Sequence, residues 1–226
     1  DFFGKTIFDI AQQQNHSLQL TGYRYKSNKL PEEFEGFRII HLSDMHNCVY
    51  GNEADDLIKK IRQNKPDIIV ITGDSFDSRR RQYFDSLDII KKLPEICPVY
   101  FVTGNHEELS PDLKQIFLSE IRQAGVKILD GKTEKIERDG ASIYLSGISD
   151  YTSFAVEMNL LQKALDKNLD CDELNAMKIA YKEKVEIFSK NKPVGFNILL
   201  SHRPEMNKVY SENSFDLVFC GHAHGG

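Results

Sequence analysis

Five short apolar runs are spaced along the chain, and polar residues of metal-ligand type follow each run directly. The runs are Arg38–Ser43, Asp67–Thr72, Pro98–Thr103, Phe196–Ser201 and Phe215–Cys220. The residues that follow them are, in the same order, Asp44-Met45-His46, Gly73-Asp74, Gly104-Asn105-His106-Glu107, His202 and Gly221-His222-Ala223-His224. Short β-branched and aromatic runs of this kind are typical of buried strands. Because ligands of open α/β sheets bind beyond the carboxyl ends of the strands, the pattern predicts a metal site at one sheet edge.

Segments with a helical spacing of apolar residues separate the first runs. We expect helices over Glu53–Asn64, Tyr83–Leu93 and Pro111–Ala124. Gly125 follows the last of these, and glycine commonly ends a helix at this position. Strands and helices that alternate in this way predict a layered α/β sandwich.

The pattern changes after Gly125. Short strands are expected over Val126–Leu129, Thr133–Arg138 and Ser142–Gly147, with Asp139-Gly140 favouring a hairpin turn. Helices are expected over Phe154–Asn168, over Cys171–Lys190 and after Pro204, and partial alternation predicts a strand over Ser17–Tyr25. We find no internal repeat or low-complexity linker. The chain is therefore interpreted as one domain over residues 1–226, with residues 1–33 as an N-terminal extension and residues 153–192 as a helical insert.

Composition excludes some classes of function. At 226 residues, with 40% hydrophobic and 28% charged residues, the chain suits one soluble globular domain. A net charge of −5 argues against a nucleic-acid partner, because such partners are bound through basic surfaces. The four cysteines lack metal-site or disulfide spacing and are interpreted as free thiols. The sequence shows no signal peptide and no apolar stretch that would span a membrane.

The polar residues at the strand ends suit two divalent cations. Two ions about 3.5–4 Å apart can clamp the attacking and leaving oxygens of a phosphoryl displacement, and they need an anionic bridge. Asp74 is the best placed bridge, while Asp44 and His46 can face one ion from a single loop. Asn105 offers a neutral oxygen, and three histidines offer imidazole nitrogens: His202, His222 and His224. Ligands of mixed nitrogen and oxygen type suit manganese, iron or zinc better than calcium, and we favour manganese.

From about Phe34 to the last residue, the chain resembles the calcineurin-like metallophosphoesterases. The motifs that carry the resemblance are Asp44-x-His46, Gly73-Asp74-x-x-Asp77, Gly104-Asn105-His106-Glu107, His202 and Gly221-His222-x-His224. The resemblance implies a four-layer α/β/β/α sandwich of two mixed sheets. It also implies one ion held by Asp44, His46, Asp74 and His224, and a second ion held by Asp74, Asn105, His202 and His222. His106 would be the general acid or electrostatic stabiliser, oriented by Asp77.

Within the family, the chain resembles a bacterial branch of small, often membrane-linked phosphoesterases. The motifs that carry this resemblance are Lys29-Leu30-Pro31 and Leu199-Leu200-Ser201-His202-Arg203-Pro204. This resemblance implies a phosphodiesterase that uses a hydroxide bridging the two ions on a small or lipid-linked substrate. Location would be cytoplasmic or membrane-associated, with peripheral membrane association among the expectations. The family continues beyond His224 with strands of its second sheet, so we expect the C-terminal part to be truncated.

Several alternatives stay open from sequence. A metal-binding module of the same fold, without turnover, is the main alternative to an enzyme, and a nuclease is a weaker one. Arg203 and Asn47 are candidates for substrate contact, although a turn role suits Asn47 as well. The Arg79-Arg80-Arg81 run suits either phosphate binding or a solvated loop. Oligomeric state is not predicted.

Overall fold

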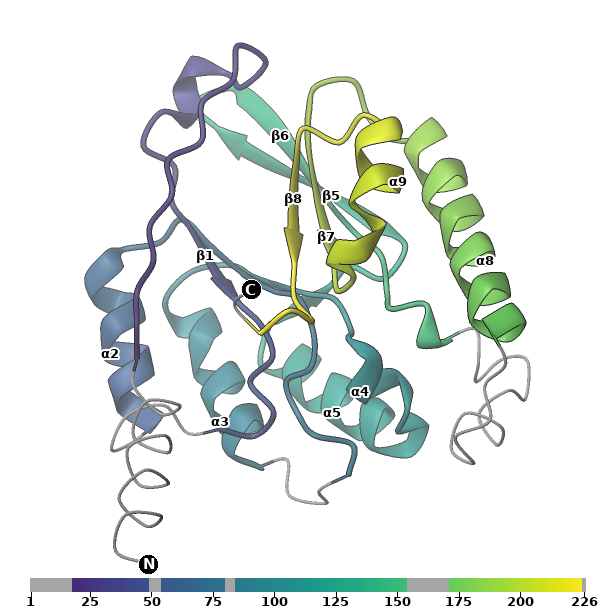
Figure 1. Cartoon of the computed structure of the whole chain (residues 1–226). Helices are drawn as coiled ribbons and strands as arrows, with labels where there is room; N and C mark the ends of the chain where they lie inside the picture. The colour runs from purple at the N-terminus through teal and green to yellow at the C-terminus, as the bar shows by residue number, and fades with distance from the viewer. Residues whose placement is uncertain (1–17, 49–53, 80–83, 154–170, 225–226) are drawn as a thin grey trace, which may run out of the picture.

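Two β-sheets face each other and carry helices on their outer sides (Figure 1). The structure is a computed structural model and describes residues 18–48, 54–79, 84–153 and 171–224. The first sheet contains β1 (Ile39–Leu42), β2 (Ile68–Ile71), β3 (Val99–Phe101) and β4 (Lys127–Ile128), in this order. The second contains β5 (Lys132–Arg138), β6 (Ala141–Gly147), β7 (Phe196–Ser201) and β8 (Leu217–Cys220).

Strand direction differs between the two sheets. All three strand pairs of the first sheet are parallel over the described residues, so the expectation of a mixed first sheet is wrong for this part of the chain. The second sheet is mixed, because β5 and β6 form an antiparallel hairpin while β6, β7 and β8 run parallel. Asp139 (φ 51°) and Gly140 (φ 88°) form the predicted turn, and positive φ at both positions is typical of a tight hairpin.

Helices cover the outer face of each sheet. The first sheet carries α2 (Ala54–Asn64), α3 (Phe84–Lys92) and α5 (Pro111–Gln123), and the second carries α8 (Cys171–Lys190) and α9 (Asn207–Glu212). Shorter elements are η1 (Glu32–Phe34), η2 (Leu93–Glu95), α4 (Asn105–Glu108) and η3 (Pro204–Met206). The architecture is the predicted α/β/β/α sandwich.

Alternation along the buried strands builds the core between these layers. In β2, Ile69 and Ile71 pack against the helices, while Ile68 and Val70 pack against the second sheet. In β7, Leu200 faces the first sheet and Leu199 faces α8 and α9. Successive side chains of a strand point to opposite faces, so a strand between two layers must be apolar on both. This explains why these strands are continuous apolar runs in the sequence.

Two expectations differ from the structure or lie outside it. Leu18–Tyr25 contains no strand, and Leu20 and Tyr23 are exposed, so the alternation there has no sheet partner. The helix expected over Phe154–Asn168 lies outside the described residues. The helix expected over Cys171–Lys190 is confirmed as α8, whereas the single domain with its N-terminal extension and helical insert stays a prediction.

Candidate metal centre

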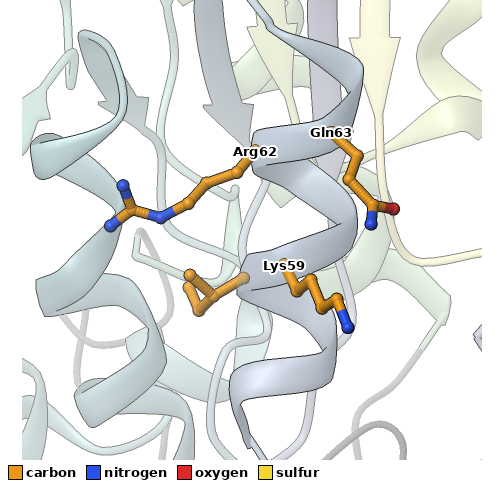
Figure 2. A pocket seen from close by; sticks show the side chains of 4 residues that line it. Lys59, Arg62 and Gln63 are labelled. Carbon is orange, nitrogen blue, oxygen red and sulfur yellow. The ribbon is translucent and has the colours of Figure 1, made fainter.

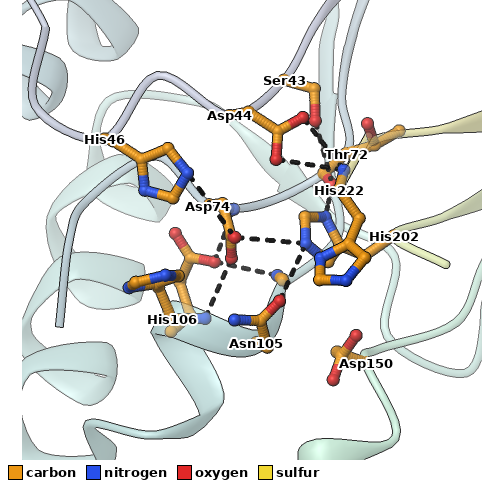
Figure 3. A network of polar contacts seen from close by, with 12 residues as sticks. Ser43, Asp44, His46, Thr72, Asp74, Asn105, His106, Asp150, His202 and His222 are labelled. Carbon is orange, nitrogen blue, oxygen red and sulfur yellow. Dashed lines mark hydrogen bonds and ion pairs between the residues drawn. The ribbon is translucent and has the colours of Figure 1, made fainter. Parts of the chain in front are cut away.

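The carboxyl ends of β1, β2, β3, β7 and β8 meet at one place, as the sequence pattern predicts. Figure 3 shows the side chains of His46, Asn105, His202 and His222 around Asp74. The backbone N–H of His222 donates to both carboxylate oxygens of Asp44, at 3.0 Å each. This contact joins the loop after β1 to the loop after β8, although 178 positions separate the two residues.

Strained backbone conformations are concentrated at this centre. Nine described residues other than glycine have positive φ, and five of them are candidate ligands: Asp44, His46, Asp74, His222 and His224. Such conformations cost about 1–3 kcal/mol each and persist only where surrounding contacts impose them. At Gly104, a Cβ atom would collide with the carboxylate and backbone nitrogen of Asp74, so only glycine allows this close approach. Holding the ligand loops in these conformations therefore lowers the stability of the fold.

A first cluster consists of Asp44, His46 and His224, whose donor atoms lie within 4.8 Å of one another. The Nε2 atoms of His46 and His224 are 3.2 Å apart, and their rings stack at 4.9 Å. Oδ1 of Asp44 lies 3.8 Å from Nε2 of His224, and Oδ2 of Asp74 lies 3.8 Å from Nε2 of His46.

A second cluster consists of Asp74, His202 and His222, again within 4.8 Å. His202 is fully buried, and its Nδ1 lies 2.6 Å from the carbonyl oxygen of Thr72, to which it donates. The other ring nitrogen, Nε2, lies 3.2 Å from Oδ2 of Asp74 and 3.2 Å from the side-chain oxygen of Asn105. A backbone acceptor that fixes the tautomer of a histidine is typical of metal ligands.

These contacts fit divalent cations. With its proton on Nδ1, His202 presents a lone pair to two oxygen atoms that also carry lone pairs, and a cation between them removes the repulsion. A second proton on Nε2 is the alternative to a cation there: burial lowers the pKa of His202, but the hydrogen bond and charge of Asp74 outweigh it and raise that pKa to about 9. The Nε2 atoms of His46 and His224 also face each other, so one cation could bind both nitrogens. Nδ1 of His46 is buried without a hydrogen-bond partner.

The ring of His106 lies beside both clusters. Its Nδ1 accepts the backbone N–H of Ser78 at 3.0 Å, and the Ser78 hydroxyl lies 3.1 Å away. Oδ1 of Asp77 is 3.3 Å from the same nitrogen, but it also accepts the backbone N–H and Nε–H of Arg79 at 3.0 Å each. Partial burial raises the pKa of Asp77, and the hydrogen bonds from Arg79 outweigh it and lower that pKa. A nitrogen that accepts carries no proton, so these bonds assign the His106 proton to Nε2.

Glu107, which the sequence reasoning quoted in a motif without a role, ties two ligand loops together. Its carboxylate is fully buried and accepts the backbone N–H groups of Asp74 (2.8 Å), Ser75 (2.7 Å) and Gly104 (2.8 Å). Burial raises the pKa of Glu107 to about 7, and the charge of Asp74 acts in the same direction. Glu107 thus holds the loop after β2 against the loop after β3.

The two candidates for substrate contact have partners within the protein. Arg203 is 7% exposed and forms an ion pair with Asp150. The side-chain oxygen of Asn47 accepts the Ser86 hydroxyl at 3.1 Å, which connects the loop after β1 to α3. Asp150 was missed by the sequence reasoning, although it follows the predicted strand Ser142–Gly147 in the same way as the ligands follow theirs.

Other features of the described residues lie apart from this centre. A surface hollow beside α2 is lined by Ile58, Lys59, Arg62 and Gln63, which include no carboxylate or imidazole (Figure 2). Among the described residues no helix combines the length and apolar character needed to cross a bilayer. Cys48, Cys97 and Cys220 are free thiols, as expected.

Comparison with known proteins shows the protein family to which the chain belongs. The sequence profile of the calcineurin-like phosphoesterase family matches residues 37–226, so the chain belongs to this family of metal-dependent phosphoester hydrolases. It is 27% identical to an uncharacterized metallophosphoesterase of Aquifex aeolicus, over all of this chain and 77% of that protein. It is 24% identical to the phosphodiesterase YaeI of Escherichia coli, over 89% of this chain and 64% of that protein.

Other relatives are longer than this chain. A transmembrane protein with a metallophosphoesterase domain from Danio rerio is 27% identical over 88% of this chain, which spans 42% of that protein. The fold resembles phosphopantetheinyl hydrolase from Mycobacterium tuberculosis, with a TM-score of 0.51 and 13% identity over 83% of both chains. At this identity the likeness supports the fold alone.

Proposed function

We propose that the chain is a phosphodiesterase that uses two divalent metal ions, with manganese as the favoured metal. The observation that supports a pair of ions is the position of one oxygen atom. Oδ2 of Asp74 lies 3.2 Å from Nε2 of His202 and 3.8 Å from Nε2 of His46, so a single carboxylate oxygen faces a histidine from each cluster. One carboxylate between two ligand sets is the arrangement that a dinuclear site requires.

The ligand sets follow from this shared oxygen. One ion would be held by Asp44, His46, His224 and Asp74, and the other by Asp74, Asn105, His202 and His222. Bound there, the ions would neutralise charge on the phosphoryl group and activate a water molecule for in-line attack. Asp74 is further held by the backbone N–H of His106, which donates to Oδ1 at 2.9 Å and leaves Oδ2 for the ions.

His106 is the proposed catalytic side chain. The backbone N–H of Ser78 donates to its Nδ1, so the N–H at Nε2 is the group that can hydrogen-bond to a phosphoryl or leaving-group oxygen. Stabilising the charge that develops there is worth a factor of about 10²–10³ in mutational studies of comparable donors. Ser78 orients the ring through this bond, and Asp77, which accepts from Arg79, lies beside Nδ1 without reacting.

The substrate class is proposed as a phosphodiester of small or lipid-linked type. Similarity to a protein named as a phosphodiesterase supports the diester, and similarity to proteins named as transmembrane supports membrane association. The net charge of −5 supports a substrate other than nucleic acid.

Hydrolysis of bis-p-nitrophenyl phosphate and p-nitrophenyl phosphate, with manganese added to chelated protein, tests the proposal. We expect turnover that depends on manganese, prefers the diester and disappears in Asp74→Ala. Asp139→Asn, in the β5–β6 hairpin, is the matched control and should behave as the wild type. Two bound ions without any turnover would instead favour a metal-binding module.

A further inference from the structure

We propose that Asp150, acting through Arg203, is a positioning residue for the metal ligand His222. The inference rests on the proposed two-metal function and assigns a role to a residue outside both ligand sets. Asp150 follows β6, which provides no candidate ligand, and it lies on the His202 and His222 side of Asp74 in Figure 3.

Asp150 binds the guanidinium of Arg203 with both carboxylate oxygens. Oδ2 accepts Nε–H, and Oδ1 accepts Nη2–H at 3.0 Å. Asp150 is completely buried and Arg203 is 7% exposed, so water does not weaken this pair. A bidentate pair also fixes the orientation of the guanidinium plane.

The other nitrogens of Arg203 also lie against groups of the protein. Nη2 donates to the Thr152 hydroxyl at 3.2 Å, and the guanidinium carbon lies 4.2 Å from the centre of the Tyr151 ring. Nη1 lies 2.9 Å from Nε2 of His222 and 3.6 Å from Glu205. Each nitrogen of Arg203 thus has a partner inside the protein, and the only candidate metal ligand among these partners is His222. This places the guanidinium of Arg203 against a candidate ligand, and the substrate contact expected from sequence stays a prediction.

Charge gives Asp150 a second effect on the metal centre. A guanidinium within hydrogen-bond distance of a ligand nitrogen repels a divalent cation at that ligand, and the repulsion is strong where water is excluded. The carboxylate of Asp150 cancels this charge. Removing only the carboxylate charge therefore both releases the guanidinium and leaves it uncompensated beside His222.

Asp150→Asn tests the role, with Co²⁺ titrated into chelated protein and followed by visible absorption. We expect the dissociation constant of the ion held by His202 and His222 to rise about 10–100-fold, as is typical when a supporting partner of a ligand is removed. The absorption bands of that ion should also change, while the ion held by Asp44, His46 and His224 binds as before. His202→Ala identifies which titration step belongs to the affected ion.

Asp216→Asn is the matched control. Its side chain is 7% exposed and pairs with Lys29 at 2.8 Å, and it precedes β8, at the opposite end of that strand from His222. This variant should lose stability without any change in either Co²⁺ step.

The double variant Asp150→Leu/Arg203→Met removes both charges and carries the test if Asp150→Asn does not fold. It should bind the affected ion more tightly than Asp150→Asn does where that variant folds, yet with altered absorption bands, because no guanidinium then lies against His222. Wild-type affinities and spectra in the folded variants, with only a lower melting temperature, would overturn the positioning role and leave the proposed function intact. A wild-type protein that binds no Co²⁺ would overturn both.

Discussion

The two nitrogens of the His106 ring have different surroundings, and this difference decides how the residue can act. Nδ1 accepts from the Ser78 backbone and lies near Asp77, whose carboxylate is also engaged by Arg79. A histidinium at this position would carry a proton on Nδ1 that faces the N–H of Ser78. The described geometry therefore favours a neutral ring that donates from Nε2.

His106→Ala should reduce turnover most on substrates with poor leaving groups. A donor matters where negative charge builds on the leaving oxygen, and p-nitrophenolate disperses that charge without help. We expect a loss of about 10²–10³ on an alkyl phosphodiester and a much smaller loss on bis-p-nitrophenyl phosphate. Steady-state kinetics of both substrates with manganese measures this, and equal losses on the two would contradict the assignment.

Glu107→Gln should destabilise the fold. The carboxylate accepts three backbone N–H groups in a buried place, whereas an amide directs two donors of its own toward them. We expect a loss of about 2–4 kcal/mol in the free energy of unfolding. Urea unfolding of chelated protein measures it, with Glu137→Gln on the exposed side of β5 as a control that changes little. A loss of unfolding free energy no larger than that of Glu137→Gln would show that Glu107 does not tie the two loops together.

At the scale of elements, β1 and β8 meet where the two sheets approach each other. The His41 ring of β1 lies 5.3 Å from the Phe219 ring of β8, and its Nε2 lies 2.7 Å from the Thr72 hydroxyl. Burial lowers the pKa of His41 to about 4, although the charge of Asp44 opposes the shift. His41 therefore packs between the strands as a neutral side chain that contacts Thr72 and Phe219.

The stability of the protein should fall between pH 6.5 and pH 4 in part because of His41. In this window the unfolded chain binds a proton at His41 and the folded chain does not, so acid favours unfolding. A shift of this size is worth up to about 3 kcal/mol at pH 4. His41→Gln keeps a polar partner for Thr72 and should show a shallower fall in urea unfolding of chelated protein. Parallel pH curves for both proteins would refute the burial of a neutral His41.

At the scale of the whole molecule, the metal centre exists only in the folded chain. Asp44 and His222 are 178 positions apart, and Asp74 and His202 come from different sheets. An unfolded chain cannot present these ligands to one ion, so metal binding is linked to folding.

Manganese should therefore raise the unfolding midpoint of the protein. At a free concentration 100 times the dissociation constant, one bound ion adds about 2.7 kcal/mol to the free energy of unfolding. Thermal unfolding of chelated protein, with and without Mn²⁺, measures the shift. Asp74→Ala should show little of it and Asp139→Asn all of it, and an equal shift in all three would mean that the ions bind elsewhere.

Local patterns in the sequence determined most of the elements and the residue types of the centre. The continuous apolar runs predicted β1, β2, β3, β7 and β8, because a strand covered on both faces has to be apolar throughout. The same runs located the ligand types, since parallel strands bring their carboxyl ends to one edge. The alternation of apolar and polar residues in Leu18–Tyr25 predicted a strand that is not formed, because a strand also needs a partner strand that no local pattern reveals.

Tertiary structure alone decided the partners of the side chains. Only the fold shows that Asp150, 53 positions from Arg203, pairs with its guanidinium. Likewise, only the fold shows that Ser78 donates to Nδ1 of His106. The parallel pairing of the described strands β1 to β4, and the role of Glu107 between two loops, also depend on segments far apart in the chain. Periodicity depends on neighbours within a few residues, so the sequence alone determines elements and ligand types. Charge state and hydrogen-bond partners depend on distances of a few ångströms between segments far apart in the chain, and only the folded chain sets these distances.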